Sequence, residues 1–488
     1  GIISLIRAAV PSCSAAVRRD FARGPFFRTF LEGRARIARL LTLMHEAELL
    51  GVVLPEFEPL TCFAHFDYVH EYTVDSHVLL ALWEFEDIER DPDSRFHPLA
   101  VQMKSRAAFR LAALLHDCAK PLDGDHSVIG AQMARSACGR FGFSEEEVDF
   151  VEFLVREHLI LSVAVRHRDM ADANLISELI RRIGTRDRLN ALFLLTHCDI
   201  RATHPANWTG YLDECFWALY ALLSKRLEMH GDTPPFEQAL AVYHPSGSEE
   251  PSRAAIRVHC ERVQDPGYRN GTDFQTILAH VSLAEAHRPG EIGMHIVRHE
   301  THCTVSFVAD DRPGMLRDFS GILTASGQSI LSGRGAMRMD GVVFDTFNVC
   351  NAWQGGPMDA EREELLRTRV AGLAAGTCSP EALMRQFRAS RARSMPPAVG
   401  VPVFARFDND LAQTATTLEI RAPDKPGLLY EILSILTDFG CDIRFIIVST
   451  QANMAFDVFT ITGPGGGRLM DEAHRDRLQQ HLLSSLTA

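Results

Sequence analysis

Histidines and carboxylates recur together along the first ~200 residues, and these side chains are where we expect chemistry. His116 and Asp117 are adjacent and follow an apolar run. Four further candidates lie before and after this pair: His77, His126, His158 and Asp199. Neutral imidazole and carboxylate groups together suit divalent metals such as Mn, Fe, Co or Zn. The pattern indicates a metal site, provided that the elements carrying these residues bring them together.

Helical periodicity dominates the part of the chain that carries these residues. Apolar side chains repeat at helical spacing in residues 37–44 and 109–115. Ser144 followed by three glutamates is typical of a helix start, because the hydroxyl caps the first turn and the acids favour its positive end. We find no convincing strand alternation before about residue 290. Ligands on separate helices converge in the core of a helical bundle, so we expect an all-α domain here.

The last 190 residues or so contain an internal repeat. Asp311-Arg312-Pro313-Gly314 recurs as Asp424-Lys425-Pro426-Gly427 at an offset of 113, and Asp345 recurs as Asp457 at an offset of 112. Each copy predicts a strand, the Pro-Gly turn, a helix, two strands joined by a turn, and a last helix. This order suits a ferredoxin-like α+β domain with room for a final or shared strand.

The Pro-Gly turns are candidate ligand sites. They expose backbone N–H groups at a helix N-terminus, where a ligand carboxylate is favoured. Asp311 and Asp424 are placed to accept hydrogen bonds from an α-amino group. Each aspartate has a plainer interpretation, because it can simply cap the helix that follows.

Composition excludes several classes of protein. A length of 488 residues predicts about three domains at ~150 residues each. Fifty basic against 63 acidic residues give a net charge of −13, which repels nucleic acid and anionic membranes. No run approaches the ~18 apolar residues of a membrane helix. Eleven scattered cysteines without a C-x-x-C pair predict reduced thiols in the cytoplasm.

The histidine and acid series resembles the HD phosphohydrolase superfamily. Its motifs are His116-Asp117 with Lys120 three residues later, Gly124-Asp125-His126-Ser127, and Asp199-Ile200-Arg201. These motifs, with the stretch ending at His77, are similar to the family of bifunctional PII uridylyltransferase/uridylyl-removing enzymes. The resemblance implies a phosphodiester hydrolase that uses one or two divalent ions (Mn, Fe, Mg or Zn). It implies six metal ligands, with Asp117 bridging two ions: His77, His116, Asp117, His126, His158 and Asp199.

The resemblance also implies catalytic roles for Asp117, Lys120 and Arg201. Lys120 would stabilise phosphate charge. It could equally be a solvated lysine that the helix dipole favours. Arg201 would pair with a phosphate or orient Asp199. From spacing alone, the metal site competes with ordinary core or surface histidines, because short motifs produce many false matches.

The repeat resembles the ACT domain, an amino-acid-sensing module, and the same enzyme family ends in two such domains. The ligand implied is glutamine or another amino acid at Asp311, Gly314, Asp424 and Gly427. The substrate implied is a PII-type signalling protein carrying UMP on a tyrosine. Homo-oligomerisation through the ACT domains is a further expectation, and neither nucleic acid nor membrane is an expected partner.

We therefore expect a multidomain chain in which an all-α HD-type helical domain precedes two α+β ferredoxin-like (βαββαβ) ACT domains. The expected parts are N-terminal helices at 1–60, the HD domain at 61–230, a connector at 231–300, the first ACT domain at 301–376, a linker at 377–414 and the second ACT domain at 415–488.

One motif of the resembled family is not found. Its nucleotidyltransferase domain has a Gly-Ser turn followed by an Asp-x-Asp pair, whereas Gly247-Ser248 lies in the connector without such a pair. We expect no nucleotidyltransferase activity from this sequence. Two alternatives stay open: an HD hydrolase acting on a free nucleotide or other small metabolite, and a non-catalytic glutamine sensor. The intact ligand set argues against the second.

Overall fold

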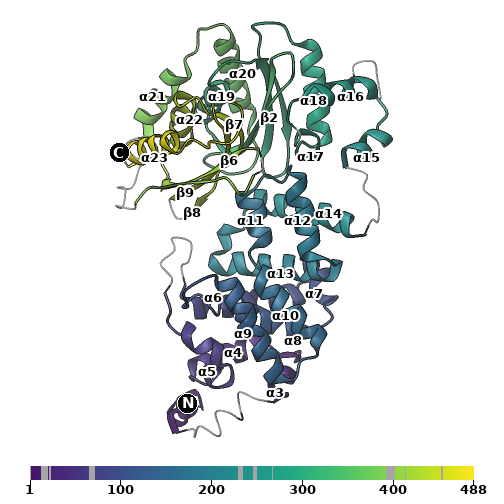
Figure 1. Cartoon of the computed structure of the whole chain (residues 1–488), viewed down its shortest axis with the longest axis vertical. Helices are drawn as coiled ribbons and strands as arrows, with labels where there is room; N and C mark the ends of the chain where they lie inside the picture. The colour runs from purple at the N-terminus through teal and green to yellow at the C-terminus, as the bar shows by residue number, and fades with distance from the viewer. Residues whose placement is uncertain are drawn as a thin grey trace. The chain divides into compact units, whose positions relative to one another are not determined.

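The computed structural model describes two compact units (Figure 1). The described residues are 2–12, 20, 24–64, 72–228, 235–245, 250–265, 267–391, 402–412, 414–451 and 454–487. One unit comprises Gly1–Val165 with Ile176–Gly231, and the other comprises Arg166–Leu175 with Asp232–Ala488. Gly247-Ser248 and residues 392–401 of the expected linker lie outside the described residues. None of the described helices combines the length and apolar character needed to cross a membrane.

The first unit is built from helices, as the sequence predicts. Its helices are α1 (Ile2–Ala9), α3 (Phe26–Leu31), α4 (Ile37–Glu46), α5 (Leu50–Val53), α6 (Val74–Arg90), α7 (His97–Val101), α8 (Arg106–Leu115), α9 (His126–Phe141), α10 (Glu145–Glu157), α13 (Arg186–Thr203) and α14 (Gly210–Glu228). Helices α11 (Ile160–His167) and α12 (Ala173–Ile183) lead into and out of the segment Arg166–Leu175.

Local sequence explains where the central helices begin. Ser144 and Glu147 form a capping box at the start of α10, in which each side chain accepts a hydrogen bond from the other residue's backbone N–H. Ser105 caps α8 by accepting from the N–H of Ala108. Every residue of α8 after the first is buried, as expected for a helix in the middle of a core. The residues that follow α8, His116 and Asp117, are therefore buried as well.

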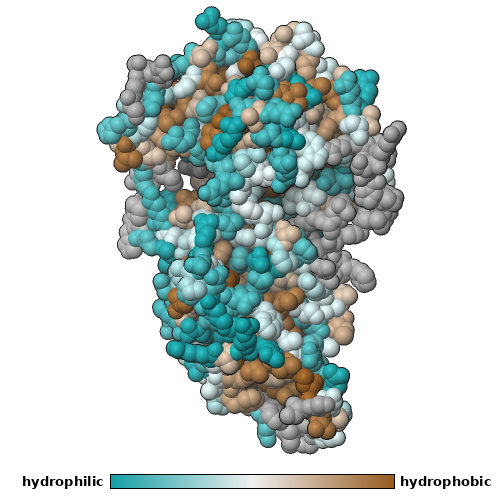
Figure 2. Space-filling view, turned by 180° about the vertical axis from the view of Figure 1, so that it is seen from behind, coloured by the Kyte–Doolittle hydropathy of each residue, from teal (hydrophilic) through white to brown (hydrophobic). Residues whose placement is uncertain are grey.

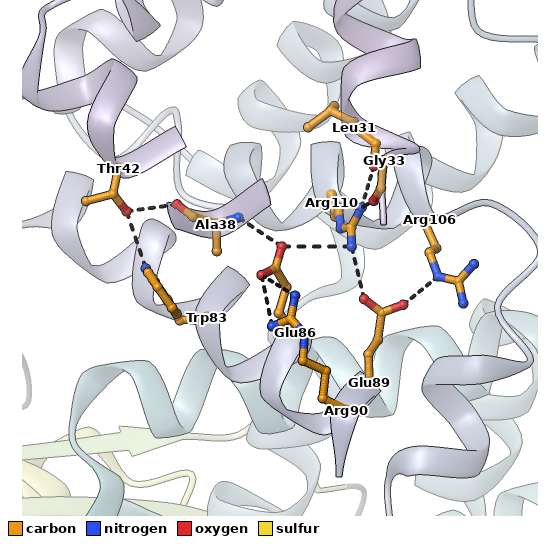
Figure 3. Close-up of polar contacts among 10 residues, drawn as sticks. All are labelled: Leu31, Gly33, Ala38, Thr42, Trp83, Glu86, Glu89, Arg90, Arg106 and Arg110. Atoms are coloured by element: carbon orange, nitrogen blue, oxygen red, sulfur yellow. Dashed lines mark hydrogen bonds and ion pairs between the residues drawn. The ribbon is translucent and has the colours of Figure 1, made fainter. Parts of the chain in front are cut away.

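A buried ionic network joins α6 and α8 to the N-terminal helices (Figure 3). Arg110 on α8 donates hydrogen bonds to the carbonyl oxygens of Leu31 (2.6 Å) and Gly33 (2.7 Å). It also pairs with Glu89 on α6 at 3.0 Å and lies 3.9 Å from Glu86. Arg110 and Glu86 are almost fully buried. This network fixes the position of the helix that carries His77 relative to the helix that precedes His116.

Replacing Arg110 with methionine is expected to destabilise the first unit by about 3–5 kcal/mol, because it removes the buried cation that Glu86 and Glu89 share and takes a donor from the carbonyl oxygens of Leu31 and Gly33. Arg106, which pairs with Glu89 from a partly exposed position, is the control. Arg106→Met is expected to cost about 0–1 kcal/mol. Urea unfolding of both variants measures the difference, and equal effects would contradict this account of the network.

The N-terminal helices form one end of the first unit, and apolar side chains are exposed there (Figure 2). The large exposed apolar side chains of these helices are Leu5, Ile6, Phe26 and Leu40. Exposed apolar surface of this kind is typical of sites that contact another protein surface.

The second unit is organised around one antiparallel sheet. Its strands are β1 (Gly293–Arg298), β2 (Cys303–Asp310), β3 (Gln328–Met337), β4 (Val342–Asn351), β5 (Phe404–Asp408), β6 (Thr416–Pro423), β7 (Asp442–Ile447), β8 (Thr450–Gln451) and β9 (Met454–Thr462). Eight of them follow the order β1-β2-β4-β3-β7-β9-β6-β5, and β8 pairs with β9. The two copies of the repeat meet where β3 pairs with β7.

Helices cover both faces of this sheet (Figure 1). One set lies within or between the copies of the repeat: α19 (Met315–Ala325), α20 (Ala360–Ala374), α21 (Pro380–Arg391), α22 (Leu428–Asp438) and α23 (Glu472–Leu486). The connector supplies the other: α15 (Pro235–Val242), α16 (Arg253–Arg262), α17 (Tyr268–Gly271) and α18 (Phe274–Ala286). The apolar core of this unit has one part on each face of the sheet, because successive residues of a strand point to opposite faces. Phe307 packs in the part that includes α19 and α22, and its neighbour Val308 packs in the part that includes α16 and α18.

Two details differ from the sequence-based expectation. The strand beside β2, expected after the last helix of the copy, is β1, which precedes β2; likewise β5 precedes and pairs with β6. Residues 377–414, expected as a linker, contain α21 and β5. Strand β5 is only five residues long and includes Arg406 and Asp408, so its alternation gives a weak signal.

The segment Arg166–Leu175 belongs to the second unit although it lies between helices of the first. Its Asp169 forms an ion pair with Arg334 on β3, whose guanidinium also lies 3.4 Å from Asp265. The same guanidinium lies over the ring of Phe445 at 4.9 Å. Two carboxylates and an aromatic face thus compensate the burial of this cation.

Candidate functional site

The six predicted metal ligands come together inside the first unit. They lie at the ends of helices: His77 in the first turn of α6, His116 and Asp117 after α8, His126 as the first residue of α9, His158 after α10, and Asp199 in α13. Separate helices thus supply one compact group of nitrogen and oxygen atoms, as expected for ligands built into a helical bundle.

Asp117 lies at the middle of this group. Its Oδ2 is 3.5 Å from Nε2 of His77 and 3.4 Å from Nε2 of His116. Its Oδ1 is 3.9 Å from Nε2 of His126 and 3.7 Å from Nε2 of His158. The two carboxylate oxygens therefore face two different pairs of imidazoles.

The group divides into two sets of three ligands. In one, Oδ1 of Asp199 lies 2.9 Å from Nε2 of His77 and 3.4 Å from Nε2 of His116. The other consists of Asp117, His126 and His158. Within each set, the candidate ligand atoms lie within 4.8 Å of one another. This spacing suits three ligands around one ion, and two sets suit two ions.

Backbone contacts set the tautomers of two histidines. Nδ1 of His116 donates to the carbonyl of Ala113 at 2.8 Å, and Nδ1 of His158 donates to the carbonyl of Val155 at 2.7 Å. Each carbonyl lies in the last turn of a helix and is free to accept. The Nε2 lone pairs are thereby directed at the centre, as in metal-binding histidines whose other nitrogen is hydrogen-bonded.

Two buried histidine nitrogen atoms without hydrogen-bond partners among the described residues indicate whether a metal cation fits this site. Nε2 of His126 and Nε2 of His158 are buried and have no hydrogen-bond partner among the described residues. A buried polar atom without a partner is costly, and a divalent cation would supply the missing interaction. Two imidazoles and one carboxylate are a donor set that Mn, Fe or Zn accepts. The residues present therefore fit a metal ion.

The charges at the site are strongly coupled. Burial lowers the pKa of His116, but the carboxylates of Asp117 and Asp199 outweigh it and raise that pKa to about 10. Burial would raise the pKa of Asp117, yet the charges of His116 and Lys120 hold it well below its usual range. Burial and the neighbouring His116 lower the pKa of His158 to about 4. The carboxylates thus favour a positive charge among them, which is the charge that a metal ion provides.

The two predicted basic residues have different surroundings. Nζ of Lys120 lies 2.7 Å from Oδ2 of Asp117, and its side chain is mostly buried. Nε of Arg201 donates to Oε2 of Glu84 at 2.9 Å and is partly exposed. The sequence analysis did not include Glu84, although it follows His77 by seven residues and so lies two turns away on the same side of α6. The catalytic roles of Lys120 and Arg201 stay predictions.

A second candidate site lies in the second unit, beside Asp424. A cavity of about 290 Å³ is lined by the turn residues Asp424, Lys425 and Gly427, by Thr450 and by Asp457. Oδ2 of Asp424 accepts a hydrogen bond from the Thr450 hydroxyl at 3.1 Å. The left-handed backbone of Gly427 (φ +80°) turns the chain into α22. This cavity has the size of the smallest ligand sites in proteins, about 300 Å³.

The first copy of the repeat has the same turn, with Gly314 at φ +82° before α19. The backbone N–H of Asp311 donates to the carbonyl of Gly341. Asp311 and Gly314 are not among the residues that line the cavity beside Asp424. The structure therefore places two of the four predicted ligand-binding residues at this cavity.

Asp457 is expected to make the second unit less stable as the pH rises. Burial and the nearby Asp424 raise the pKa of Asp457 to about 8, so its protonated form is favoured in the folded state. The stabilisation is present below the ordinary pKa near 4 and is lost as the pH rises through about 8. Asp457→Asn should raise the free energy of unfolding at pH 8 and flatten its decline from pH 5. Urea unfolding without added amino acid measures this, with exposed Asp438→Asn as control; a steeper decline in the variant would contradict it.

Family models of two domain classes match stretches of this chain. A family model described as HD domain matches residues 76–196, and one described as ACT domain matches residues 416–477. The first unit therefore contains an HD domain, a metal-dependent class, and the second contains an ACT domain. The HD match includes five of the six predicted ligands and ends three residues before Asp199.

Curated proteins named bifunctional uridylyltransferase/uridylyl-removing enzyme are similar to nearly the whole chain. Those of Phenylobacterium zucineum and Azospirillum brasilense are each 29% identical, over 97% and 96% of the chain. That of Ruegeria pomeroyi is 28% identical over 99% of the chain. The matched region is 51%, 51% and 54% of these relatives, so the chain spans about half of their length.

Proposed function

We propose that this chain is a metal-dependent hydrolase that removes UMP from a uridylylated PII-type protein and responds to glutamine at its ACT domains. One observation carries the hydrolase part: two three-ligand sets share the first unit's core, with unpartnered imidazole nitrogens directed at Asp117. The name of the relatives supports the choice of substrate. The scissile bond is then the phosphodiester between the uridylyl phosphate and a tyrosine oxygen.

The metal ligands in this proposal are His77, His116 and Asp199 for one ion and His126, His158 and the shared Asp117 for another. When bound, divalent ions lower the pKa of water and polarise a phosphoryl oxygen. Backbone carbonyls hold the imidazoles of His116 and His158 in the tautomer that presents Nε2. No rotation of these rings is then needed at the moment of reaction.

Lys120 has two tasks in this mechanism. Its ammonium pairs with Oδ2 of Asp117 and so keeps that carboxylate ionised. Its charge also lies beside the ligands, where it can stabilise negative charge on the phosphoryl oxygens. Arg201, held by Glu84, is proposed to contact the substrate phosphate or to keep the end of α13 in place for Asp199.

Regulation is proposed to act through the ACT domains. The cavity beside Asp424 offers the carboxyl groups of Asp424 and Asp457 for an α-ammonium group and a helix N-terminus for an α-carboxylate. We propose glutamine as its ligand, a cytoplasmic setting, and self-association through these domains. Only hydrolysis is proposed here; nucleotidyl transfer is not expected of these residues.

A substrate panel tests the proposal against its alternatives. The chain is incubated with manganese and either uridylylated PII or small nucleotides, with and without glutamine. The proposal predicts UMP release from PII at a rate that glutamine changes. Cleavage of small nucleotides but not of uridylylated PII would instead indicate a metabolite hydrolase. Absence of both metal and hydrolysis would indicate a non-catalytic sensor.

A further inference from the structure

The cavity beside Asp424 is built by both copies of the repeat. The second copy supplies the turn before α22, with Asp424, and the strand β9, with Asp457. The first copy supplies Gln328, Ser329 and Ile330 at the start of β3. Because the copies meet symmetrically at β3 and β7, the turn before α19, strand β4 and the start of β7 occupy the corresponding positions around Asp311, where Asp442 and Asp345 lie close enough to interact with one another and with Asp311.

The repeat identifies which residues correspond at the two places. Ile330 corresponds to Ile443, so Ser329 corresponds to Asp442. Strand pairing agrees with this assignment: Ile330 pairs with Val349 and Ile443 pairs with Ile461, which are themselves 112 residues apart. The position that Ser329 occupies with a hydroxyl beside Asp424 is therefore occupied by the carboxylate of Asp442 beside Asp311.

This difference adds a negative charge to the surroundings of Asp311 that the surroundings of Asp424 lack. Beside Asp311, burial and repulsion from Asp442 raise the pKa of Asp311. Burial, Asp442 and Asp311 together raise the pKa of Asp345 to about 8. Three carboxylates thus act on one another there, and the adjacent Arg312 is paired with Asp318 at 2.6 Å.

The place beside Asp424 has two carboxylates. Asp457 is buried in the wall of the cavity, and its Oδ1 has no hydrogen-bond partner among the described residues. A buried acceptor without a partner favours a ligand that donates to it. An α-ammonium group placed between Asp424 and Asp457 would do so, and its charge would lower the pKa of Asp457 and favour the ionised carboxylate. Lys425 also lines the cavity and is paired with Glu431 at 3.3 Å, much as Arg312 is paired with Asp318 in the first copy.

We propose that only one of the two corresponding positions is a ligand site: an α-amino acid binds beside Asp424 and not beside Asp311. The residue at the start of the opposing strand, Ser329 beside Asp424 and Asp442 beside Asp311, decides which position binds. The ammonium group lies between Asp424 and Asp457. The Ser329 hydroxyl donates to an oxygen of the ligand, at the position where Asp442 repels one in the other copy. This inference rests on the proposed regulation by an amino acid.

Isothermal titration of the full chain with L-glutamine tests this inference, and the repeat provides matched controls. Wild type is expected to bind one glutamine per chain. Asp424→Asn and Ser329→Asp are each expected to weaken binding by about tenfold or more, because each removes or opposes a charged hydrogen bond. The corresponding variant of the first copy, Asp311→Asn, is expected to change the Kd less than about twofold. Asp442→Ser gives the first copy the residue that favours binding, so it is expected to bind a second glutamine per chain beside Asp311. Thermal unfolding of each variant without ligand confirms that it is folded.

Several results would overturn the inference. Two equal sites per chain in the wild type would do so. A loss of binding in Asp311→Asn with normal binding in Asp424→Asn would also do so, and would leave the proposed regulation intact. If wild type gives no binding heat with L-glutamine, and none with a panel of other L-amino acids at several temperatures, the proposed regulation itself fails and this inference fails with it.

Discussion

Asp117→Asn is expected to remove the bound metal and to lower the rate of hydrolysis by about 10³-fold or more. The substitution keeps the shape of the side chain and removes its charge. Asp117 is the residue whose two oxygens face all four histidines, at 3.4 to 3.9 Å from their Nε2 atoms. Loss of its charge therefore weakens both ligand sets at once.

Metal analysis after dialysis, with hydrolysis measured on the same sample, checks this result. Asp123→Asn is the matched control, since Asp123 is exposed and lies only six residues further along the chain. The control is expected to keep the metal content and rate of wild type. If Asp117→Asn kept wild-type metal stoichiometry while remaining folded, the assignment of the site would be wrong.

His158→Gln is expected to lower the metal content from two ions to one per chain. His158 belongs to the set with His126 and Asp117, whereas His77, His116 and Asp199 form a complete set without it. The rate is expected to fall by about 10²-fold, since one of two ions no longer acts on the phosphate. The smaller loss separates this variant from Asp117→Asn.

The control for His158→Gln is His197→Gln. His197 is another buried histidine of the first unit, whose pKa burial lowers to about 3, and its ring stacks on Phe96 at 3.9 Å. It lies outside both ligand sets. Titration with manganese should give two binding events in His197→Gln and one in His158→Gln. Two events in both variants would show that the second ion has other ligands.

The types of the site residues could be predicted from the sequence, but their convergence could not. Histidine and carboxylate types, with a resemblance to a known motif, were sufficient to name all six side chains that the structure brings together. That they meet at helix ends depends on packing, above all on α8, which is buried on every side and so places His116 and Asp117 in the core. The contact between Arg201 and Glu84 joins residues 117 positions apart, and no local pattern indicates it.

Much of the second unit could also be predicted from the sequence, because the repeat carries its own periodicity. Helices α19 and α22 begin at the Pro-Gly turns as expected. The pairing of β3 with β7 could not be predicted, since strand alternation indicates a strand and not its neighbour. The same holds for β1 and β5, which are short and only partly buried.

Anomalous diffraction from crystals soaked in manganese tests the central claim most directly. We expect one peak between His77, His116 and Asp199 and a second between His126, His158 and Asp117. The two peaks should lie on either side of the Asp117 carboxylate, because its oxygens face different histidine pairs. No peak within this group at saturating manganese, in crystals whose six side chains are ordered, would contradict the account.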